Sequence, residues 1–528
     1  MDEIYELFDQ YPAIPACMGL FVLFMICLNF KRRRQEAQAL LPEGSCTRGS
    51  SPVFVSPKNA SRGGLLSDVL YRWSPRDPFP VRDLLRSVAI FGASGSGKTS
   101  GSGFQIARAV VRNPRIGGLI IASKLEDREF WQRVFHQAGR KHDLLVFSPE
   151  SPLRFNFLDF VQRSGDTRDI TQAIMVIGET LEMGRGRESE PFWRQQYERM
   201  IYNAVEIVLL ATGKVTAPDL QRFINGAAQD PDELAKPEWQ AGFHNQCLKA
   251  AFGNHRTPVQ KHDYALASDY WLKEYPAMAD KTRSSILAGV MGILHVFNTG
   301  IVRELVSTTT NVSPAVMDQG KWVLVDMPIS SDGAAGALVL GGWKYLTQRH
   351  ILKRHATENT PACVIWADEA QKVVNSFDSA YLAECRSHRG CMVYLTQSIH
   401  AFYSRMREGG EHDTDALLTN FYHKVFHALG DDKSASFAGS LIGKRARTRF
   451  GGSMTPSDNA YDELFGPSRL SPSWSEHVEN ILENREFMQG LRTGGPENGF
   501  MVDGIVVRSG EPFANGEAWM RVAFSQND

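Results

Sequence analysis

The stretch Gly92-Ala-Ser-Gly-Ser-Gly-Lys-Thr99 decides the fold, because it has the composition and spacing of a phosphate-binding loop. It follows a short apolar run, Val88–Phe91, that predicts a buried strand, and a helical stretch, Thr99–Arg112, opens directly behind it. Strand, glycine-rich loop and helix are the context that this pattern requires. The alternative is a chance glycine-serine turn, which these flanks disfavour.

Each residue type in the loop suits phosphate chemistry. Glycines let successive backbone N–H groups curl around the phosphates, and the helix N-terminus adds partial positive charge. We expect Lys98 to reach the β- and γ-phosphates and the Thr99 hydroxyl to bind Mg²⁺, so ATP and Mg²⁺ are the expected cofactors. The residues expected to bind the nucleotide are Gly92, Ala93, Ser94, Gly95, Ser96, Gly97, Lys98, Thr99 and Ser100.

The 528 residues carry a net charge of −1, so no global basic excess indicates a nucleic-acid binder. Contact with DNA would depend on local basic patches. The seven cysteines are scattered, and no pair has the close spacing of a zinc site. This usage indicates a reduced compartment rather than a disulfide framework.

The N-terminus predicts a membrane anchor within residues 1–34. Ala16–Phe30 is almost wholly apolar, and about 20 helical residues cross a bilayer. Lys31–Arg34 follows this run and acidic residues precede it, so the N-terminus should lie outside and the bulk of the chain in the cytoplasm. A buried helix or a signal peptide is the alternative, but a signal peptide carries its positive charge before the apolar run.

Strand-like and helical stretches alternate in two parts of the chain, 71–164 and 311–528, which predicts an α/β fold with a doubly wound parallel sheet. Residues 35–70 are rich in Ser, Pro and Gly and are expected to form a linker. Between the two α/β parts, residues 165–310 show helical periodicity and predict an inserted all-α domain. Residues 445–480 are polar and turn-rich, and predict a loop.

A second motif, Cys363–Glu369, is an apolar strand that ends in two adjacent carboxylates, as in the Walker B pattern. We expect Asp368 to hold Mg²⁺ and Glu369 to polarise the attacking water. Acidic residues also favour helix starts, which is the alternative explanation of this pair.

Polar residues flank the next predicted strand, Cys391–Thr396. Gln397 follows it and is expected to sense the γ-phosphate, unless it only caps the following turn. Arg386 and Arg389 precede it. An arginine supplied across a subunit boundary stabilises charge in phosphoryl transfer, although a solvated helix end explains the same residues.

Taken together, these blocks resemble the type IV coupling proteins, the TraG/TraD class of conjugative DNA-transport ATPases. The likeness spans residues 85–510. Besides the two motifs, it is carried by Phe155–Asp159, Pro191–Trp193, Lys281–Ile286, the pair Arg386 and Gln397, and Gly494–Gly499.

The resemblance implies a RecA-like P-loop NTPase domain with an inserted all-α domain, here preceded by the single N-terminal transmembrane helix that the apolar run predicts. It implies Glu369, Lys98, Arg386 and Gln397 as catalytic residues, with Arg386 acting in trans, and Thr99 and Asp368 at the metal. It also implies a homo-hexamer on the bacterial inner membrane, with a periplasmic N-terminus. The implied partners are DNA, relaxase and relaxosome proteins, and components of a type IV secretion channel.

Two departures from the family pattern stand out. Such proteins usually have two membrane spans, and this chain offers one. The usual Asp-Pro-Lys-Gly-like segment reads Ala122-Ser-Lys-Leu-Glu126 here, so Lys124 survives without its neighbours and has no assigned role.

A local basic run, Lys444, Arg445, Arg447 and Arg449, is the expected DNA contact, and a solvated charged loop is the alternative. Binding should not depend on sequence, and the DNA could be single- or double-stranded. Two other functions fit the chain. One is a receptor ATPase for effector proteins, and the other is a docking protein whose ATP site mainly drives ring assembly.

Overall fold

A computed structural model describes residues 53–54, 64–163, 165–182, 191–254, 257–406, 410–454 and 470–527. The predicted anchor at 1–34 and most of the predicted linker at 35–70 lie outside these ranges. Within them, no single helix is long and apolar enough to cross a bilayer, and two helix pairs pass that test only when joined across bends of 110° and 72°.

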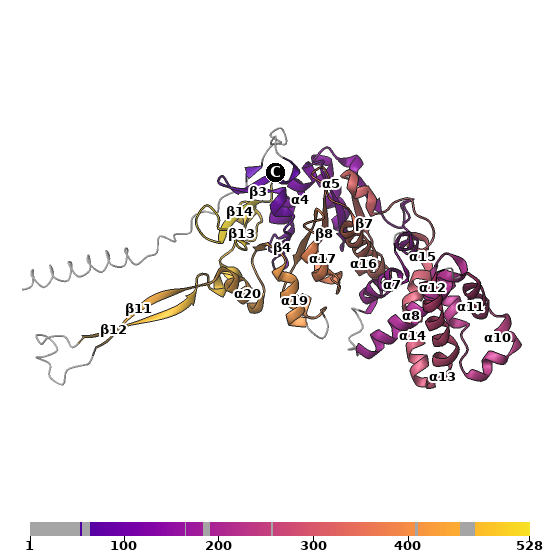
Figure 1. Cartoon of the computed structure of the whole chain (residues 1–528). Coiled ribbons are helices and arrows are strands. Elements are labelled where there is room, and N and C mark those ends of the chain that lie inside the picture. The colour runs from indigo at the N-terminus through magenta and orange to yellow at the C-terminus, as the bar shows by residue number, and fades with distance from the viewer. Residues whose placement is uncertain are drawn as a thin grey trace, which may run out of the picture. The chain divides into compact units, whose positions relative to one another are not determined.

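The central sheet has nine strands in the order β14-β13-β10-β4-β9-β8-β5-β7-β6. Figure 1 labels β14, β13, β4, β8 and β7 among them, from left to right. The strands from β10 to β6 are parallel, whereas β13 pairs antiparallel with β10 and with β14. The predicted α/β class with a parallel-dominated sheet is therefore confirmed. The strands are β4 (Val88–Phe91), β5 (Ile116–Ala122), β6 (Leu144–Phe147), β7 (Trp322–Asp326), β8 (Ala362–Ala367), β9 (Gly390–Thr396), β10 (His423–Phe426), β13 (Met501–Arg508) and β14 (Trp519–Ser525).

The sheet is buried on both faces, because neighbouring side chains on a strand point to opposite sides. On β8, Cys363 and Ile365 join one apolar core, whereas Val364 and Trp366 join the other. Helices α7 (Thr167–Glu182) and α16 (Ile329–Lys353) contribute to the first core, and α4 (Phe104–Arg112) and α5 (Glu126–Gln137) contribute to the second. Burial on both sides explains why the parallel strands read as continuous apolar runs.

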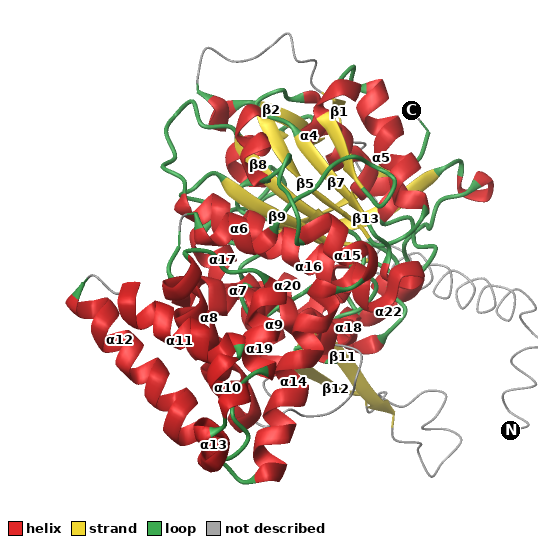
Figure 2. Cartoon of the chain, turned by 90° about the vertical axis from the view of Figure 1, so that its right-hand side faces the viewer, coloured by secondary structure: helices red, strands yellow, loops and turns green. Residues whose placement is uncertain are grey.

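The described chain between β6 and β7 forms helices and no strands. Figure 2 shows α8 to α14 grouped together beside the sheet, and α7 and α14 pack on α16. The longer helices of this group, α8 and α14, bury one face in the shared core. The helices here are α6 (Phe157–Gln162), α7, α8 (Pro191–Thr212), α9 (Ala217–Asn225), α10 (Pro237–Ala241), α11 (Phe243–Asn254), α12 (Pro258–Asp269), α13 (Tyr275–Ala277), α14 (Asp280–Asn298) and α15 (Gly300–Val306).

Two smaller sheets depart from the sequence-based expectations. β1 (Val53–Phe54) lies within the predicted linker and pairs with β2 (Val69–Ser74), which pairs with β3 (Asp77–Pro80). The prediction of a loop at 445–480 is wrong, because β11 (Lys444–Met454) and β12 (Leu470–Asn480) form an antiparallel ribbon. The described side chains of β11 are exposed, so this strand lacks the apolar alternation that usually identifies one.

Short helices complete the described chain. One lies between β3 and β4, and the others lie between the strands from β8 to β13. They are α3 (Val81–Leu84), α17 (Asp378–Glu384), α18 (His400–Tyr403), α19 (Gly410–Thr419), α20 (Asp432–Ile442) and α22 (Asn484–Gln489).

Candidate active site

The loop at 92–99 leaves the carboxyl end of β4 and is held by the strands on either side. The Gly92 N–H donates to the carbonyl oxygen of Thr396 at 3.1 Å, and the Ala93 N–H donates to that of Ala428 at 2.8 Å. One contact comes from the end of β9 and the other from the segment after β10. The loop is therefore fixed at its base by backbone bonds.

Glycine is required inside the loop for two reasons. Gly95 and Gly97 have φ values of 75° and 81°, in the left-handed region that other residues rarely adopt. A Cβ on Gly97 would also lie 2.6 Å from Cγ2 of Val502 on β13. The C-terminal strand pair thus closes the back of the loop, a contact that the sequence did not predict.

The helical stretch behind the loop begins at Thr99 as predicted, but its first turn is not a regular α-helix. Residues Thr99–Gly103 form one π-helical turn, and the regular helix α4 starts at Phe104. The Gly103 N–H donates to the Lys98 carbonyl oxygen at 2.9 Å, and a Cβ on Gly103 would lie 2.8 Å from that oxygen. A wide turn of this kind is common at functional sites, and here it depends on glycine.

The two predicted metal ligands meet. Thr99 Oγ1 donates to Asp368 Oδ2 at 2.9 Å. Lys98 is buried, and this burial lowers its pKa, while the nearby carboxylates Asp368 and Glu369 oppose that change and Lys124 adds to it. Lys98, Thr99 and Asp368 therefore come together from two strand ends.

Glu369 is held in an unusual backbone conformation by three side chains. Its φ of 52° is left-handed, which for a non-glycine residue is typical of functional sites. Oε1 accepts from Gln397 Nε2 at 2.9 Å and lies 2.9 Å from Lys124 Nζ, and Oε2 accepts from Gln371 Nε2 at 2.7 Å. Burial would raise the pKa of Glu369, but these donors outweigh it and lower the pKa to about 2.

The structure thus brings Gln397 to Glu369 and into the lining of the same cavity as the loop at 92–99. The capping role belongs to its neighbour instead, because Ser398 Oγ accepts from the His400 N–H at 3.1 Å. Sequence reasoning left Lys124 without a role and missed Gln371. The only sequence signal for Gln371 is its place two residues after Glu369.

One cavity of about 590 Å³, a size typical of ligand sites, is lined by Lys98, Thr99, Lys124, Glu369 and Gln397 together with other residues of the loop. Ser96 Oγ is buried without a hydrogen-bond partner among the described residues. The cavity is lined by Ala93, Ser94, Gly95, Ser96, Gly97, Lys98, Thr99, Ser100, Phe104, Lys124, Phe130, Arg133, Gln137, Glu369, Gln397 and Gln526.

The site suits Mg²⁺ held together with a phosphate. Among the described residues, no three His, Cys, Asp or Glu side chains gather to hold a metal by themselves. Mg²⁺ is commonly bound through one or two carboxylates and substrate phosphates, so Thr99 and Asp368 at the edge of a phosphate-sized cradle fit it. Ser100, also expected at the nucleotide, is exposed, and its Oγ accepts from Gln526 Nε2 at 2.6 Å.

Arg386 does not reach the site of its own chain. It is exposed and precedes β9, whereas Gln397 follows the same strand. The 7 residues of β9 span about 20 Å at roughly 3.3 Å per residue. Arg354 fixes the turn at Arg386, because it donates to the carbonyl oxygens of His388 at 2.7 Å and Arg389 at 2.8 Å.

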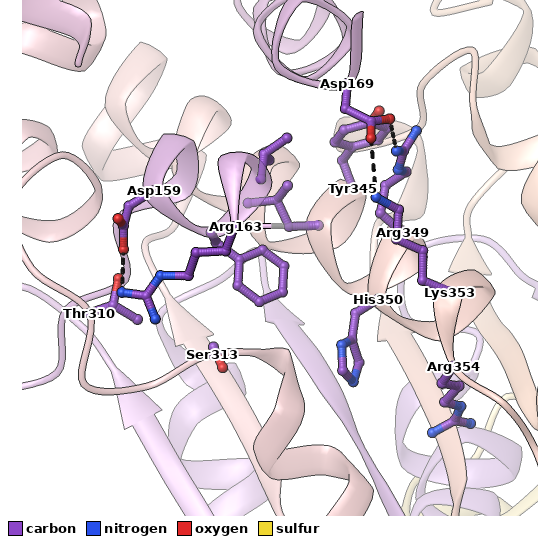
Figure 3. Close-up of a pocket in the computed structure, with 13 residues that line it drawn as sticks. Asp159, Arg163, Asp169, Thr310, Ser313, Tyr345, Arg349, His350, Lys353 and Arg354 are labelled. Atoms are coloured by element: carbon purple, nitrogen blue, oxygen red, sulfur yellow. Dashed lines mark hydrogen bonds and ion pairs between the residues drawn. The ribbon is translucent and has the colours of Figure 1, made fainter. Parts of the chain in front are cut away.

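A second cavity, of about 330 Å³, lies beside α16 and is drawn in Figure 3. Its cationic side chains face acids. Arg349 and Lys353 both pair with Asp169, and Arg354 pairs with Asp318 at 2.8 Å. The pairs with Asp169 join α16 to α7, and the pair with Asp318 joins the end of α16 to the turn Pro314–Gln319, so the charges of this cavity have a structural role.

The predicted DNA contacts lie on the ribbon, away from the loop at 92–99. Lys444, Arg445 and Arg447 are exposed, and Arg447 Nη1 lies 3.7 Å from Glu479 Oε2. The side chain of Arg449 lies outside the described residues. The structure thus brings these basic residues together on β11 and not at the cavity.

Comparison with known proteins gives one family. A model of the family described as type IV secretory system conjugative DNA transfer matches residues 70–455. A search of curated proteins gives no match.

Solved structures of one protein share the fold. Plasmid coupling protein TrwB in complex with ADP and Mg²⁺ is 12% identical, with a TM-score of 0.55 over 91% of this chain and 95% of that chain. TrwB in complex with the ATP analogue ADPNP is also 12% identical, with a TM-score of 0.55 over 91% of this chain and 96% of that chain. The unbound bacterial conjugative coupling protein TrwBdeltaN70 is 12% identical, with a TM-score of 0.53 over 91% of this chain and 96% of that chain.

Proposed function

Because the chain belongs to the type IV secretory system conjugative DNA transfer family, we propose that it is a membrane-anchored hexameric ATPase. It couples ATP hydrolysis to the recruitment and transfer of DNA, with its bound relaxase, into a type IV secretion channel. One observation carries the ATPase assignment. From three neighbouring strand ends, Lys98, Thr99, Glu369 and Gln397 meet around one cavity, and Asp368 accepts a hydrogen bond from Thr99 beside it.

The roles follow from these positions. The loop N–H groups and Lys98 bind the phosphates, and Thr99 and Asp368 would hold Mg²⁺, which neutralises phosphate charge when bound. Glu369 accepts a proton from the attacking water, and Gln397 orients that water. The complexes of TrwB with ADP and Mg²⁺ and with ADPNP support the choice of cofactors. The parallel sheet around the loop supports a RecA-like P-loop domain.

A ring is proposed because Arg386, the arginine expected at the γ-phosphate, does not line the cavity of its own chain. It is exposed at the opposite end of β9 from Gln397, so we assign it to the site of another copy. Arginine supplied in this way stabilises the transferring phosphoryl group. We place the ring on the inner membrane through a single span within residues 1–34, with the N-terminus periplasmic and the bulk of the chain cytoplasmic.

DNA contact is assigned to Lys444, Arg445, Arg447 and Arg449. Their exposure on a narrow ribbon suits the phosphate backbone of single- or double-stranded DNA, without readout of bases. The helical group α8 to α14 is the proposed receiver of relaxosome proteins.

The test is the ATPase rate of the full chain in detergent, measured alone and with single-stranded or double-stranded DNA. We expect hydrolysis that DNA accelerates, and Lys98→Ala as the control should hydrolyse nothing while remaining folded. Hydrolysis that DNA leaves unchanged would favour effector proteins as cargo. Nucleotide binding without turnover would favour a docking protein.

A further inference from the structure

Among the residues that the structure describes, Lys124 is the one cation in an ion pair with the carboxylate assigned to the attacking water. Its Nζ lies 2.9 Å from Glu369 Oε1 and 3.8 Å from Asp368 Oδ2. Gln397 donates to the same oxygen of Glu369, and Gln371 donates to the other. Oε1 thus faces two protein donors, one for each of its lone pairs, and has none left for a water.

The backbone of Lys124 is held independently of its side chain. Asp127 Oδ2 accepts from the N–H groups of Ser123 at 2.8 Å and Lys124 at 2.9 Å. The Ser123 hydroxyl in turn donates to the Asp368 carbonyl oxygen at 3.0 Å. The Lys124 side chain is 39% exposed and lines the 590 Å³ cavity. The ammonium group can therefore change partner while its Cα stays in place.

The charges in the cavity favour such a change. The cavity lining holds three cations, Lys98, Lys124 and Arg133, but one carboxylate, Glu369. A triphosphate brings several negative charges, and its γ-phosphate is the part that reaches towards Glu369 and Gln397. A charge-assisted bond to phosphate is among the stronger hydrogen bonds, so the γ-phosphate competes well for the Lys124 ammonium group.

We propose that Lys124 is a positioning residue that restrains Glu369 in the empty site and moves its ion pair to the γ-phosphate when ATP binds. The move frees Glu369 Oε1 for the attacking water. A diphosphate has no γ-phosphate, so it leaves Lys124 on Glu369. Lys124 thereby makes the activation of Glu369 depend on the nucleotide that is to be hydrolysed. This inference rests on the proposed ATPase function.

The test measures the ratio of ATP affinity to ADP affinity by calorimetry, in full chains carrying Glu369→Gln so that ATP persists. Adding Lys124→Met should lower ATP affinity by about tenfold, the worth of one charge-assisted bond, and leave ADP affinity near its starting value. Lys124→Arg should recover part of the ratio. In chains with native Glu369, Lys124→Met should also lower kcat.

Gln371→Leu is the matched control. It removes a hydrogen bond to Glu369 from a residue outside the cavity lining, so the affinity ratio should not change. Equal losses of ATP and ADP affinity in Lys124→Met, or an unchanged ratio, would overturn the proposal and leave a purely structural ion pair.

The two proposals fail in different ways. A wild-type chain that binds nucleotide but does not hydrolyse it contradicts the ATPase assignment, while the affinity ratio still reports on Lys124. A wild-type chain that binds neither nucleotide overturns both.

Discussion

Thr99 Oγ1 donates a hydrogen bond to Asp368 Oδ2 and so joins two segments that are 269 positions apart in the chain. The two residues leave β4 and β8, and β9 lies between these strands. Parallel strands end at one edge of the sheet, which is why distant segments meet there. Both proposed Mg²⁺ ligands are therefore within reach of one ion before any ligand arrives.

Glu369→Gln should bind ATP normally and hydrolyse it about 10²–10⁴-fold more slowly, which is the usual worth of a general base. The amide keeps the shape of the side chain and leaves Asp368 in place. Nucleotide affinity and single-turnover rates measure the two effects. Asp368→Asn is the matched control and should instead weaken the dependence of binding on Mg²⁺. Loss of nucleotide binding in Glu369→Gln would instead assign Mg²⁺ binding to Glu369 and activation of the water to Asp368.

Arg386→Ala should bind ATP but lose on the order of 10³-fold or more in rate, as expected for an arginine finger. Lys98→Ala chains keep Arg386 and cannot hydrolyse, so mixing the two variants should restore part of the activity. The measurement is the ATPase rate against mixing ratio. Absence of recovery at every ratio, with mixed assemblies confirmed, would exclude action in trans.

Replacing Lys444, Arg445, Arg447 and Arg449 with Ala should weaken DNA binding and flatten its dependence on salt. Each lost phosphate contact lowers the slope of log K against log salt by about 0.7–0.9. DNA binding titrated at several salt concentrations gives the slope. Lys249→Ala with Lys261→Ala removes exposed charge from the helical group and serves as control. If this control lowers the slope instead, the DNA surface lies on the helices.

Acid should destabilise the helical group through His244. Its ring is buried and stacks on Phe223 with 4.0 Å between centroids, and burial lowers its pKa from 6.5 to about 4, although a hydrogen bond to a backbone carbonyl acts in the opposite sense. The unfolded chain takes up the proton below about pH 6.5 and the folded chain only near pH 4. Stability is therefore complete above pH 6.5 and is lost as the pH falls towards 4.

The size of this effect is about 3 kcal/mol at 1.36 kcal/mol per pKa unit. Urea unfolding at several pH values, followed by circular dichroism, measures it. The pKa values of His423 and His427 are also lowered by burial, so the wild type is compared with His244→Gln, which should lose less stability on acidification. Equal losses of stability in the wild type and in His244→Gln would contradict the assignment of the acid sensitivity to His244.

The two motifs could be predicted because each is local. A phosphate loop needs only a strand, its glycines and a helix, and Asp368 needs only the apolar strand before it. The parallel-dominated sheet followed from apolar runs that alternate with helices.

The contacts of Lys124 could not be predicted in this way. They depend on β5 lying next to β8, and strand order is set by packing over the whole sheet rather than by any short pattern. Val502 behind Gly97 depends likewise on the antiparallel pair β13 and β14. The ribbon β11–β12 was missed because strands that meet solvent carry few apolar residues.

Strand β9 has a mechanical consequence. It is buried along its length and hydrogen-bonded to β4 and β8, so it can neither stretch nor bend appreciably. Gln397 stands at one end and the Arg386 turn at the other, so a displacement at Gln397 would move the whole strand and the Arg386 turn with it. In a ring, loss of phosphate in one copy would then shift the arginine offered to the next. The measurable sign is an ATPase rate that rises cooperatively with ATP concentration, and strictly hyperbolic kinetics would argue against this transmission.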